Sequence, residues 1–124
     1  MEELNLKCYA HLGDGVYEVF IREKIVYKTP VLSKLHKLNT TFVCASFQCE
    51  LLEYLEPYLN EKEMDLSRRG RNIQTSSARR INQSLHRIAT GFEVLIGYWY
   101  LHDKNRLQEI FNLIDKYISS KSLL

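Results

Sequence analysis

The sequence predicts an all-α domain, and three observations support this fold class. Only two prolines and five glycines occur among 124 residues, too few for a loop-rich β architecture. Long stretches are rich in Leu, Glu, Lys, Gln and Arg, which favour helices. The length and a hydrophobic content of 45% suit one compact domain that buries a core of its own. We therefore expect residues 1–124 to form a single helical domain.

The segment before Pro30 predicts two helices, over residues 3–11 and 14–28. Asp14 can cap the second helix, and Gly13 allows the tight entry into it. Pro30 then ends the apolar pattern.

The middle of the chain predicts three more helices. Residues 31–38 form a short one, and residues 39–56 form a longer one whose apolar positions recur at near-helical spacing up to a proline. Asn60 and Glu63 have the spacing of a capping box and start the third helix, for which Gly70 suits the C-terminal cap.

The last third of the chain predicts a loop followed by two helices. Residues 71–84 are polar, rich in Ser and Arg, and without an apolar period. They predict a loop of about a dozen residues, long enough to be suspected of function. Residues 82–102 and 104–119 carry the helical patterns, and the second of these is amphipathic.

Membrane and export classes are excluded by composition. The most apolar run, residues 91–101, contains Glu93 and falls well short of the roughly 20 residues that span a bilayer. The acidic start is not followed by a signal-type apolar segment, so we expect a cytoplasmic protein. Three cysteines without CxxC spacing predict neither a disulfide framework nor a zinc site. We expect Cys8, Cys44 and Cys49 to be small buried residues.

Glu93 is the only charged residue in the run 91–101. At helical spacing it shares a stripe with His86, Thr90 and Gly97, which are polar or small. On one interpretation Glu93 is the solvent edge of an amphipathic helix. On the other it is paired, bound to a metal or placed in a cleft, because apolar residues surround most of the helix. Both interpretations remain open at this point.

Asp14 also has two interpretations, and they are compatible. It can cap a helix, or it can join Glu93 in an oxygen-lined site of the kind that Mg²⁺ occupies while keeping several waters. A metal held in this way can activate a water for in-line hydrolysis of a phosphodiester.

Arginines supply all the charge between Leu66 and Phe92, where no acidic residue occurs. A charged run is in most proteins only a solvated surface. Arginine is nevertheless the residue whose planar fork pairs best with phosphate oxygens, so beside two carboxylates it suggests a nuclease. The six arginines are Arg68, Arg69, Arg71, Arg79, Arg80 and Arg87.

Four motifs stand in order along the chain: GDGVYE at 13–18, KLHK at 34–37, RRGRN at 68–72 and ATGFEVLIGYWYL at 89–101. In order and approximate spacing they resemble the motifs of Mini-ribonuclease III, the branch of the ribonuclease III family without a double-stranded-RNA-binding domain. The resemblance runs from about Leu4 to Leu113, which is nearly the whole chain. Four ordered motifs are much more specific than any one of them.

The resemblance implies an all-α, ribonuclease III-like helical bundle that works as a homodimeric endoribonuclease. It implies cleavage of double-stranded RNA with Mg²⁺, for which Mn²⁺ can substitute, and maturation of the ends of the large-subunit ribosomal RNA precursor. Asp14 looks like the family's catalytic aspartate and Glu93 like its catalytic glutamate, and both would hold the metal.

The motifs depart from full-length ribonuclease III at two acidic positions. Ala10 stands where the larger enzymes have a glutamate, and Thr90 where they have an aspartate. The Mini branch resembles this chain at both places. With two carboxylates instead of four, more of the metal coordination must come from water and RNA phosphate, so we expect weaker metal binding. Gly15 also replaces the usual alanine, which lowers helix propensity.

RNA contacts are expected on two of the matched motifs. The deep major groove of duplex RNA hides its base edges, so proteins read phosphates, 2′-hydroxyls and shape. We expect these contacts from the arginines of RRGRN and of the loop that follows it, with weaker candidates in KLHK. The residues are Arg68, Arg69 and Arg71, then Arg79 and Arg80, and then His36 and Lys37.

A homodimer suits duplex RNA because the two backbones are related by local two-fold symmetry, and a dimer presents one site to each strand. The apolar face of the first helices, with Val19, Phe20 and Ile21, can supply the dimer contact.

Two other functions stay open. One is a catalytically inactive ribonuclease III-like module that binds structured RNA, and the other is a helical interaction domain that binds no RNA. Retention of Asp14 and Glu93 favours the enzyme over the inactive module.

Overall fold

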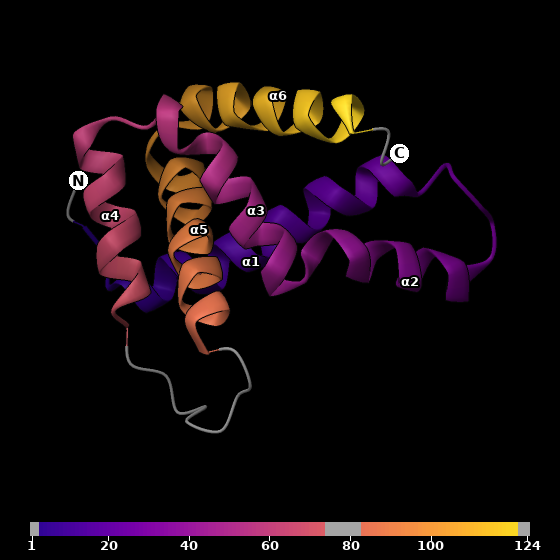
Figure 1. Ribbon diagram of the computed structural model, residues 1–124, viewed down its shortest axis with the longest axis horizontal. Helices are drawn as coiled ribbons and strands as arrows, with labels where there is room; N and C mark the ends of the chain where they lie inside the picture. Colours follow the sequence, from indigo (N-terminus) through magenta and orange to yellow (C-terminus); the bar gives the residue numbers. More distant parts are fainter. Residues whose placement is uncertain (1–2, 74–82, 122–124) are drawn as a thin grey trace.

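All the elements of the computed structural model are helical over the residues it describes, 3–73 and 83–121, which confirms the predicted fold class (Figure 1). No helix in these two ranges is long and apolar enough to cross a membrane. The elements are α1 (Leu6–Ile25), α2 (Leu32–Val43), α3 (Ala45–Leu55), the 3₁₀ turn η1 (Glu56–Tyr58), α4 (Glu61–Arg71), α5 (Gln83–His102) and α6 (Lys104–Ser120).

Helix α5 is the centre of the bundle, and α1, α3 and α4 pack around it while α6 lies across one end (Figure 1). Its sequence explains this position, because apolar residues surround most of its second half. Phe92, Leu95 and Trp99 are buried almost completely. The core continues into the other helices through Tyr17, Ile21, Phe42, Leu51, Leu55, Ile110 and Ile114.

Helix α1 is continuous from Leu6 to Ile25, so the predicted break at Gly13 and the capping role of Asp14 are wrong. Asn5 caps the helix instead, and its side chain accepts a hydrogen bond of 2.9 Å from the amide of Lys7. A buried stripe at four-residue intervals faces the core along the whole helix. The stripe consists of Tyr9, Gly13, Tyr17, Ile21 and Ile25.

The break between α2 and α3 lies at Cys44, not at Asn39 as the sequence predicts. Asn39 is buried inside α2. The last carbonyls of a helix lack partners within it, and the side chain of Gln48 donates to one of them, that of Val43, at 2.9 Å. This contact across the break stabilises the end of α2 where the local sequence offers no recognisable cap.

The remaining boundaries follow the sequence with one exception. Asn60 and Glu63 form the predicted capping box, in which each side chain accepts from the amide of the other at 2.9 Å. Helix α4 continues one residue past Gly70, to Arg71, and Asn72 takes the cap position. Gly70 packs on α5 instead, where an added Cβ would come within 3.0 Å of the Cα of Gly91. The described parts of α5 and α6 match the predicted ranges to within one residue.

The cysteines are free, and the prediction that all three are buried is wrong. Cys8 is exposed, and Cys44 and Cys49 are half-buried. The thiol of Cys49 donates to the carbonyl of Leu85 at 3.1 Å. Cys49 therefore makes a weak polar contact between α3 and α5 rather than filling the core.

A buried ion pair joins α4, α5 and α6. Glu63 is only 5% exposed. Its carboxylate accepts from the Nε1 of Trp99 at 2.9 Å and from the Nε and Nη2 of Arg106 at 2.8 and 2.9 Å. Arg106 also donates to the carbonyl of Tyr58 at 2.7 Å. With the Asn60 amide, these donors satisfy both carboxylate oxygens of Glu63.

We expect Glu63→Gln to lower the free energy of unfolding at neutral pH by about 3 kcal/mol, because it leaves the largely buried Arg106 without its buried charge partner and with only the exposed Glu109 at 3.9 Å. Burial alone would raise the pKa of Glu63, but the donors Arg106, the Asn60 amide and Trp99 outweigh it, and the pKa lies below its ordinary value. The ion pair therefore stabilises the fold fully above the pKa that Glu63 has in the unfolded chain. This stabilisation is lost as the pH falls through the lower pKa that Glu63 has in the folded chain.

Urea unfolding of wild type and Glu63→Gln between pH 7 and pH 3 measures this effect. The difference in free energy of unfolding between wild type and Glu63→Gln, which we call the stability gap, should narrow as the pH falls. Glu61→Gln, on the exposed first turn of α4, is the control and should stay close to wild type throughout. A gap that does not change with pH would contradict the assignment.

Candidate active site

Helices α1 and α5 cross in direct backbone contact. A Cβ added to Gly13 would lie 1.9 Å from the carbonyl oxygen of Glu93 and 2.9 Å from the amide nitrogen of Gly97. A Cβ added to Gly97 would lie 2.0 Å from the carbonyl oxygen of Tyr9. No side chain fits at either position, so two glycines permit the close approach. The helices run in opposite directions here, with Tyr9 against Gly97 and Gly13 against Glu93.

The crossing brings Asp14 and Glu93 to the same region of the molecule, although they are far apart in the sequence. Asp14 follows Gly13 directly and is exposed in the middle of α1. Glu93 is half-buried, and its neighbours Phe92 and Val94 are fully buried. Glu93 is therefore not simply the exposed edge of an amphipathic helix. Its backbone is fixed on both sides by the core.

The donor set of this region consists of carboxylate oxygens, which fit Mg²⁺. Within the described residues, no group of three or more His, Cys, Asp or Glu side chains could hold a metal ion. Ala10 is half-buried and brings no ligand, and the hydroxyl of Thr90 donates to the carbonyl of His86 at 2.8 Å. Two carboxylates alone would leave most coordination positions of a bound metal to water, which is the coordination that Mg²⁺ usually keeps.

A groove with a partly apolar lining runs along the outer side of α1, and we call it the α1–α6 groove. Its first part, of about 520 Å³, is lined by apolar side chains and by four charged or polar ones. The apolar or aromatic residues are Val16, Val19, Phe20, Tyr100, Leu107 and Phe111, and the others are Glu23, Lys24, Gln108 and Asp115. A second part, also about 520 Å³, continues past Val16, Val19 and Tyr100 to His11, Leu12 and Asp14. Val19 is 55% exposed. Ile21 is completely buried, so the prediction that it can supply a dimer contact is wrong. Phe20 is half-buried and stacks on Phe111, with 3.9 Å between ring centres.

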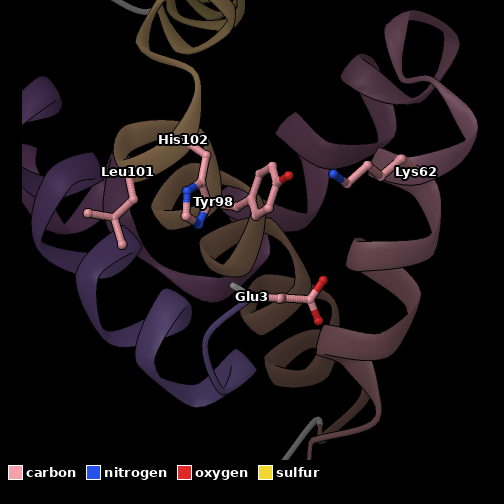
Figure 2. A pocket seen from close by; sticks show the side chains of 5 residues that line it. All are labelled: Glu3, Lys62, Tyr98, Leu101 and His102. Atoms are coloured by element: carbon pink, nitrogen blue, oxygen red, sulfur yellow. The ribbon is translucent and has the colours of Figure 1, made fainter. Parts of the chain in front are cut away.

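A polar pocket of about 320 Å³ lies near the carboxyl end of α5 (Figure 2). The hydroxyl of Tyr9 accepts from the amide of Leu4 at 2.9 Å and forms a second hydrogen bond of 2.7 Å with the Nε2 of His102. These bonds fix the N-terminal segment, and with it Glu3, against α5. The pocket is lined by Glu3, Lys62, Tyr98, Leu101 and His102.

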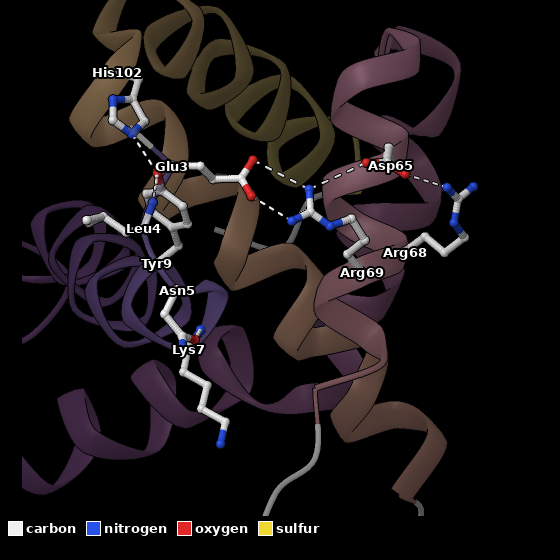
Figure 3. A network of polar contacts seen from close by, with 9 residues as sticks. All are labelled: Glu3, Leu4, Asn5, Lys7, Tyr9, Asp65, Arg68, Arg69 and His102. Carbon is white, nitrogen blue, oxygen red and sulfur yellow. Dashed lines mark hydrogen bonds and ion pairs between the residues drawn. The ribbon is translucent and has the colours of Figure 1, made fainter. Parts of the chain in front are cut away.

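Two of the predicted RNA-binding arginines already have carboxylate partners. The Nη2 of Arg69 lies 2.6 Å from the Oε1 of Glu3, and its Nη1 lies 3.6 Å from Asp65 (Figure 3). Arg68 also pairs with Asp65. The hydrogen bond from Arg69 lowers the pKa of Glu3. Arg71, at the end of α4, is exposed.

The other predicted RNA-binding residues lie elsewhere. His36 and Lys37 are exposed on α2, which lies on the opposite side of α5 from α4 (Figure 1). Arg79 and Arg80 lie outside the residues that the structure describes. The described candidates therefore form two separate groups, one on each side of the α1–α5 crossing.

Two contacts near these groups were not expected from the sequence. Glu3 pairs with Arg69, and Asn39 on α2 donates to the carboxylate of Glu18 at 3.4 Å. The sequence did carry one signal for the helix crossing. Glycine inside a helix costs stability relative to alanine, so Gly13 and Gly97 within helical patterns indicate places where a close backbone contact excludes a side chain.

Comparison with known proteins gives consistent matches. The family described as "Ribonuclease III domain" matches residues 8–104. A protein named Mini-ribonuclease 3 from Clostridium tetani is 40% identical over 118 residues, which cover 92% of this chain and 78% of the relative. One of the same name from Gloeobacter violaceus is 38% identical, with 94% and 87% covered. A crystal structure of a Fusobacterium nucleatum protein superposes with a TM-score of 0.77 at 27% identity, covering 87% of this chain and 88% of the other.

Proposed function

Because the chain belongs to the ribonuclease III family, and is an endoribonuclease similar to Mini-ribonuclease 3, we propose that Asp14 and Glu93 form its active site. The family acts on double-stranded RNA, and we propose duplex RNA as the substrate and Mg²⁺ as the metal, with Mn²⁺ as a substitute. The observation that carries the proposal is the backbone contact of Gly13 with Glu93, which supports a shared site for the two carboxylates.

The chain's own residues orient and stabilise this site. The glycine crossing holds the backbones of α1 and α5 together, and the buried Phe92 and Val94 fix the turn that carries Glu93. When bound, Mg²⁺ stabilises charge on the phosphodiester and lowers the pKa of an attacking water. Asp14 and Glu93 orient the metal, and basic side chains on α4 and α2 hold the RNA backbone.

We propose that the natural substrate is the large-subunit ribosomal RNA precursor, that residues 1–124 form one catalytic domain, and that the enzyme works in the cytoplasm. The contacts of α1, α3 and α4 with α5 support a single domain.

For the substrate class, the test is incubation with duplex RNA, duplex DNA and single-stranded RNA, each with and without Mg²⁺. We expect cleavage of duplex RNA only, and only with the metal. Binding of duplex RNA without cleavage would favour the inactive module instead.

For RNA binding we propose Arg68, Arg69 and Arg71 on α4, with Arg79 and Arg80 after them and His36 and Lys37 on α2. Exposure of the described members and the affinity of guanidinium groups for phosphate support this assignment. RNA phosphate and the carboxylate of Glu3 then compete for Arg69.

We expect Glu3→Gln to tighten binding of duplex RNA by about 2- to 5-fold at low salt, because Arg69 then loses its closer carboxylate partner and keeps only the 3.6 Å contact with Asp65. The slope of log Kd against log salt should also steepen by up to about one unit, since one more phosphate is neutralised. Fluorescence anisotropy with labelled duplex and no divalent metal measures both. Glu61→Gln makes the same change of charge on exposed α4, and an equal gain there would contradict the competition.

We propose that the enzyme is a homodimer joined through the first part of the α1–α6 groove, around Val19, Phe20 and Phe111, and not through the second part, which holds Asp14. The exposed apolar lining supports this, as does the two-fold relation of the strands in duplex RNA. We expect Val19→Glu to give monomers, because a carboxylate buried there would have no partner. Light scattering after gel filtration measures the mass. Val26→Glu, at a residue that is 52% exposed outside the groove, is the control and should leave the dimer intact.

A further inference from the structure

Glu18 lies one helical turn after Asp14 on the same side of α1. The residue before each carboxylate packs on α5. Gly13 contacts the backbone of Glu93, and the ring of Tyr17 meets that of Phe92 edge to face at 5.1 Å. Because Asp14 and Glu18 follow these two contacts directly, both leave α1 on the same side of the crossing. That side also holds α2, because Asn39 of α2 contacts Glu18.

Asn39 of α2 binds Glu18 and has an unused polar atom. Its Nδ2 donates to the Oε1 of Glu18 at 3.4 Å, and the residue is only 8% exposed. Its Oδ1 is buried and has no hydrogen-bond partner within the described residues. A buried acceptor without a donor costs about 1–3 kcal/mol, so a bound water is the expected partner. A carboxamide and a carboxylate thus lie together one helical turn after Asp14, and the carboxamide has an acceptor that a water can use.

We propose that Glu18, held by Asn39, is a positioning residue that binds water molecules around the metal at Asp14 and Glu93. This inference rests on the proposed function. Glu18 does not act as a direct ligand here, because the described residues contain no three-ligand cluster. It adds a third negative charge near a site that lacks acids at Ala10 and Thr90. Groups behind the direct ligands commonly change metal affinity by about 10- to 100-fold.

We expect Glu18→Gln to weaken metal binding by about 10-fold, because Gln keeps the acceptor for Asn39 and loses only the charge. Glu18→Asp keeps the charge and should bind metal within about 3-fold of wild type. Arg22 lies 3.5 Å from Glu18 and partly neutralises it, so Arg22→Gln should tighten metal binding by about 2-fold. Arg22 is 60% exposed, and its replacement should leave the fold unchanged.

Binding of Mn²⁺ without RNA, followed by electron paramagnetic resonance, measures the effect independently of catalysis. A parallel Mg²⁺ titration of cleavage should show a higher half-saturating concentration for Glu18→Gln and a maximal rate within about 3-fold of wild type. Glu53→Gln, exposed on α3, is the control for loss of one negative charge and should match wild type.

The inference is overturned if Glu18→Gln and Arg22→Gln both bind Mn²⁺ like wild type while Asp14→Asn does not, and the proposed active site then stands. If Asp14→Asn and Glu93→Gln also bind Mn²⁺ like wild type, the proposed site itself is wrong. If Glu18→Gln fails to fold, the Mn²⁺ affinity of Arg22→Gln decides. That variant removes the positive charge that partly neutralises Glu18, and it does so at an exposed residue.

Discussion

Replacing Glu93 with Gln, or Asp14 with Asn, should slow cleavage of duplex RNA by about two to four orders of magnitude. Each change keeps the size of the side chain and removes a ligand of the proposed metal. A metal ion contributes several kcal/mol of charge stabilisation in the transition state, and each 1.36 kcal/mol corresponds to tenfold in rate. The contact of Gly13 at this crossing is with the backbone of residue 93, so the fold should not change.

Single-turnover cleavage, with circular dichroism and RNA binding on the same samples, checks this prediction. Binding of duplex RNA should be unchanged or slightly tighter, because a negative charge is lost near the phosphates. Thr90→Ala is the matched control on the same helical turn, since its hydroxyl is used within α5. A folded Asp14→Asn or Glu93→Gln variant that keeps more than about a tenth of the wild-type rate would contradict the assignment.

Gly13→Ala should be the most destabilising small substitution in α1. Its methyl group would lie 1.9 Å from the carbonyl oxygen and 2.8 Å from the carbonyl carbon of Glu93, which are backbone atoms that cannot rotate away. The helices must then separate, at a cost of about 3 kcal/mol or more. Since the crossing carries Asp14 and Glu93, cleavage should fall with stability.

Gly15→Ala, two residues along the same helix, is the control. A Cβ at Gly15 meets nothing within 4 Å. Alanine there should stabilise α1 by up to about 1 kcal/mol through helix propensity. Thermal unfolding of both variants measures the difference, and equal melting temperatures would refute the role given to the crossing.

The helical fold class and most element boundaries were predictable because their causes are local. The capping box of Asn60 and Glu63 and the apolar periods of α5 and α6 can be read from neighbouring residues. The prediction failed at Gly13 and Gly70, where glycine was taken as a helix boundary. In both places glycine serves a contact with α5, and this tertiary packing overrides the local preference.

The candidate site was only partly predictable. The matched motifs named Asp14 and Glu93, and the structure adds the helix crossing between them. The pairs of Glu3 with Arg69 and of Glu18 with Asn39 join residues distant in sequence, and such contacts have no local signature. The pairs of Asp65 with Arg68 and Arg69 do have a local signature, because these residues are three and four apart on one helix, whereas nothing in the run around RRGRN indicated the pair with Glu3.

The double variant Asp14→Asn with Glu93→Gln tests the central claim most directly, which is that the two carboxylates act together on one metal. Single-turnover cleavage of duplex RNA is compared for wild type, both single variants and the double variant. If they form one site, the double variant should be no slower than the slower single variant, because losing either ligand already removes the metal's contribution. Losses that multiply would show that Asp14 and Glu93 act independently, and would contradict the account.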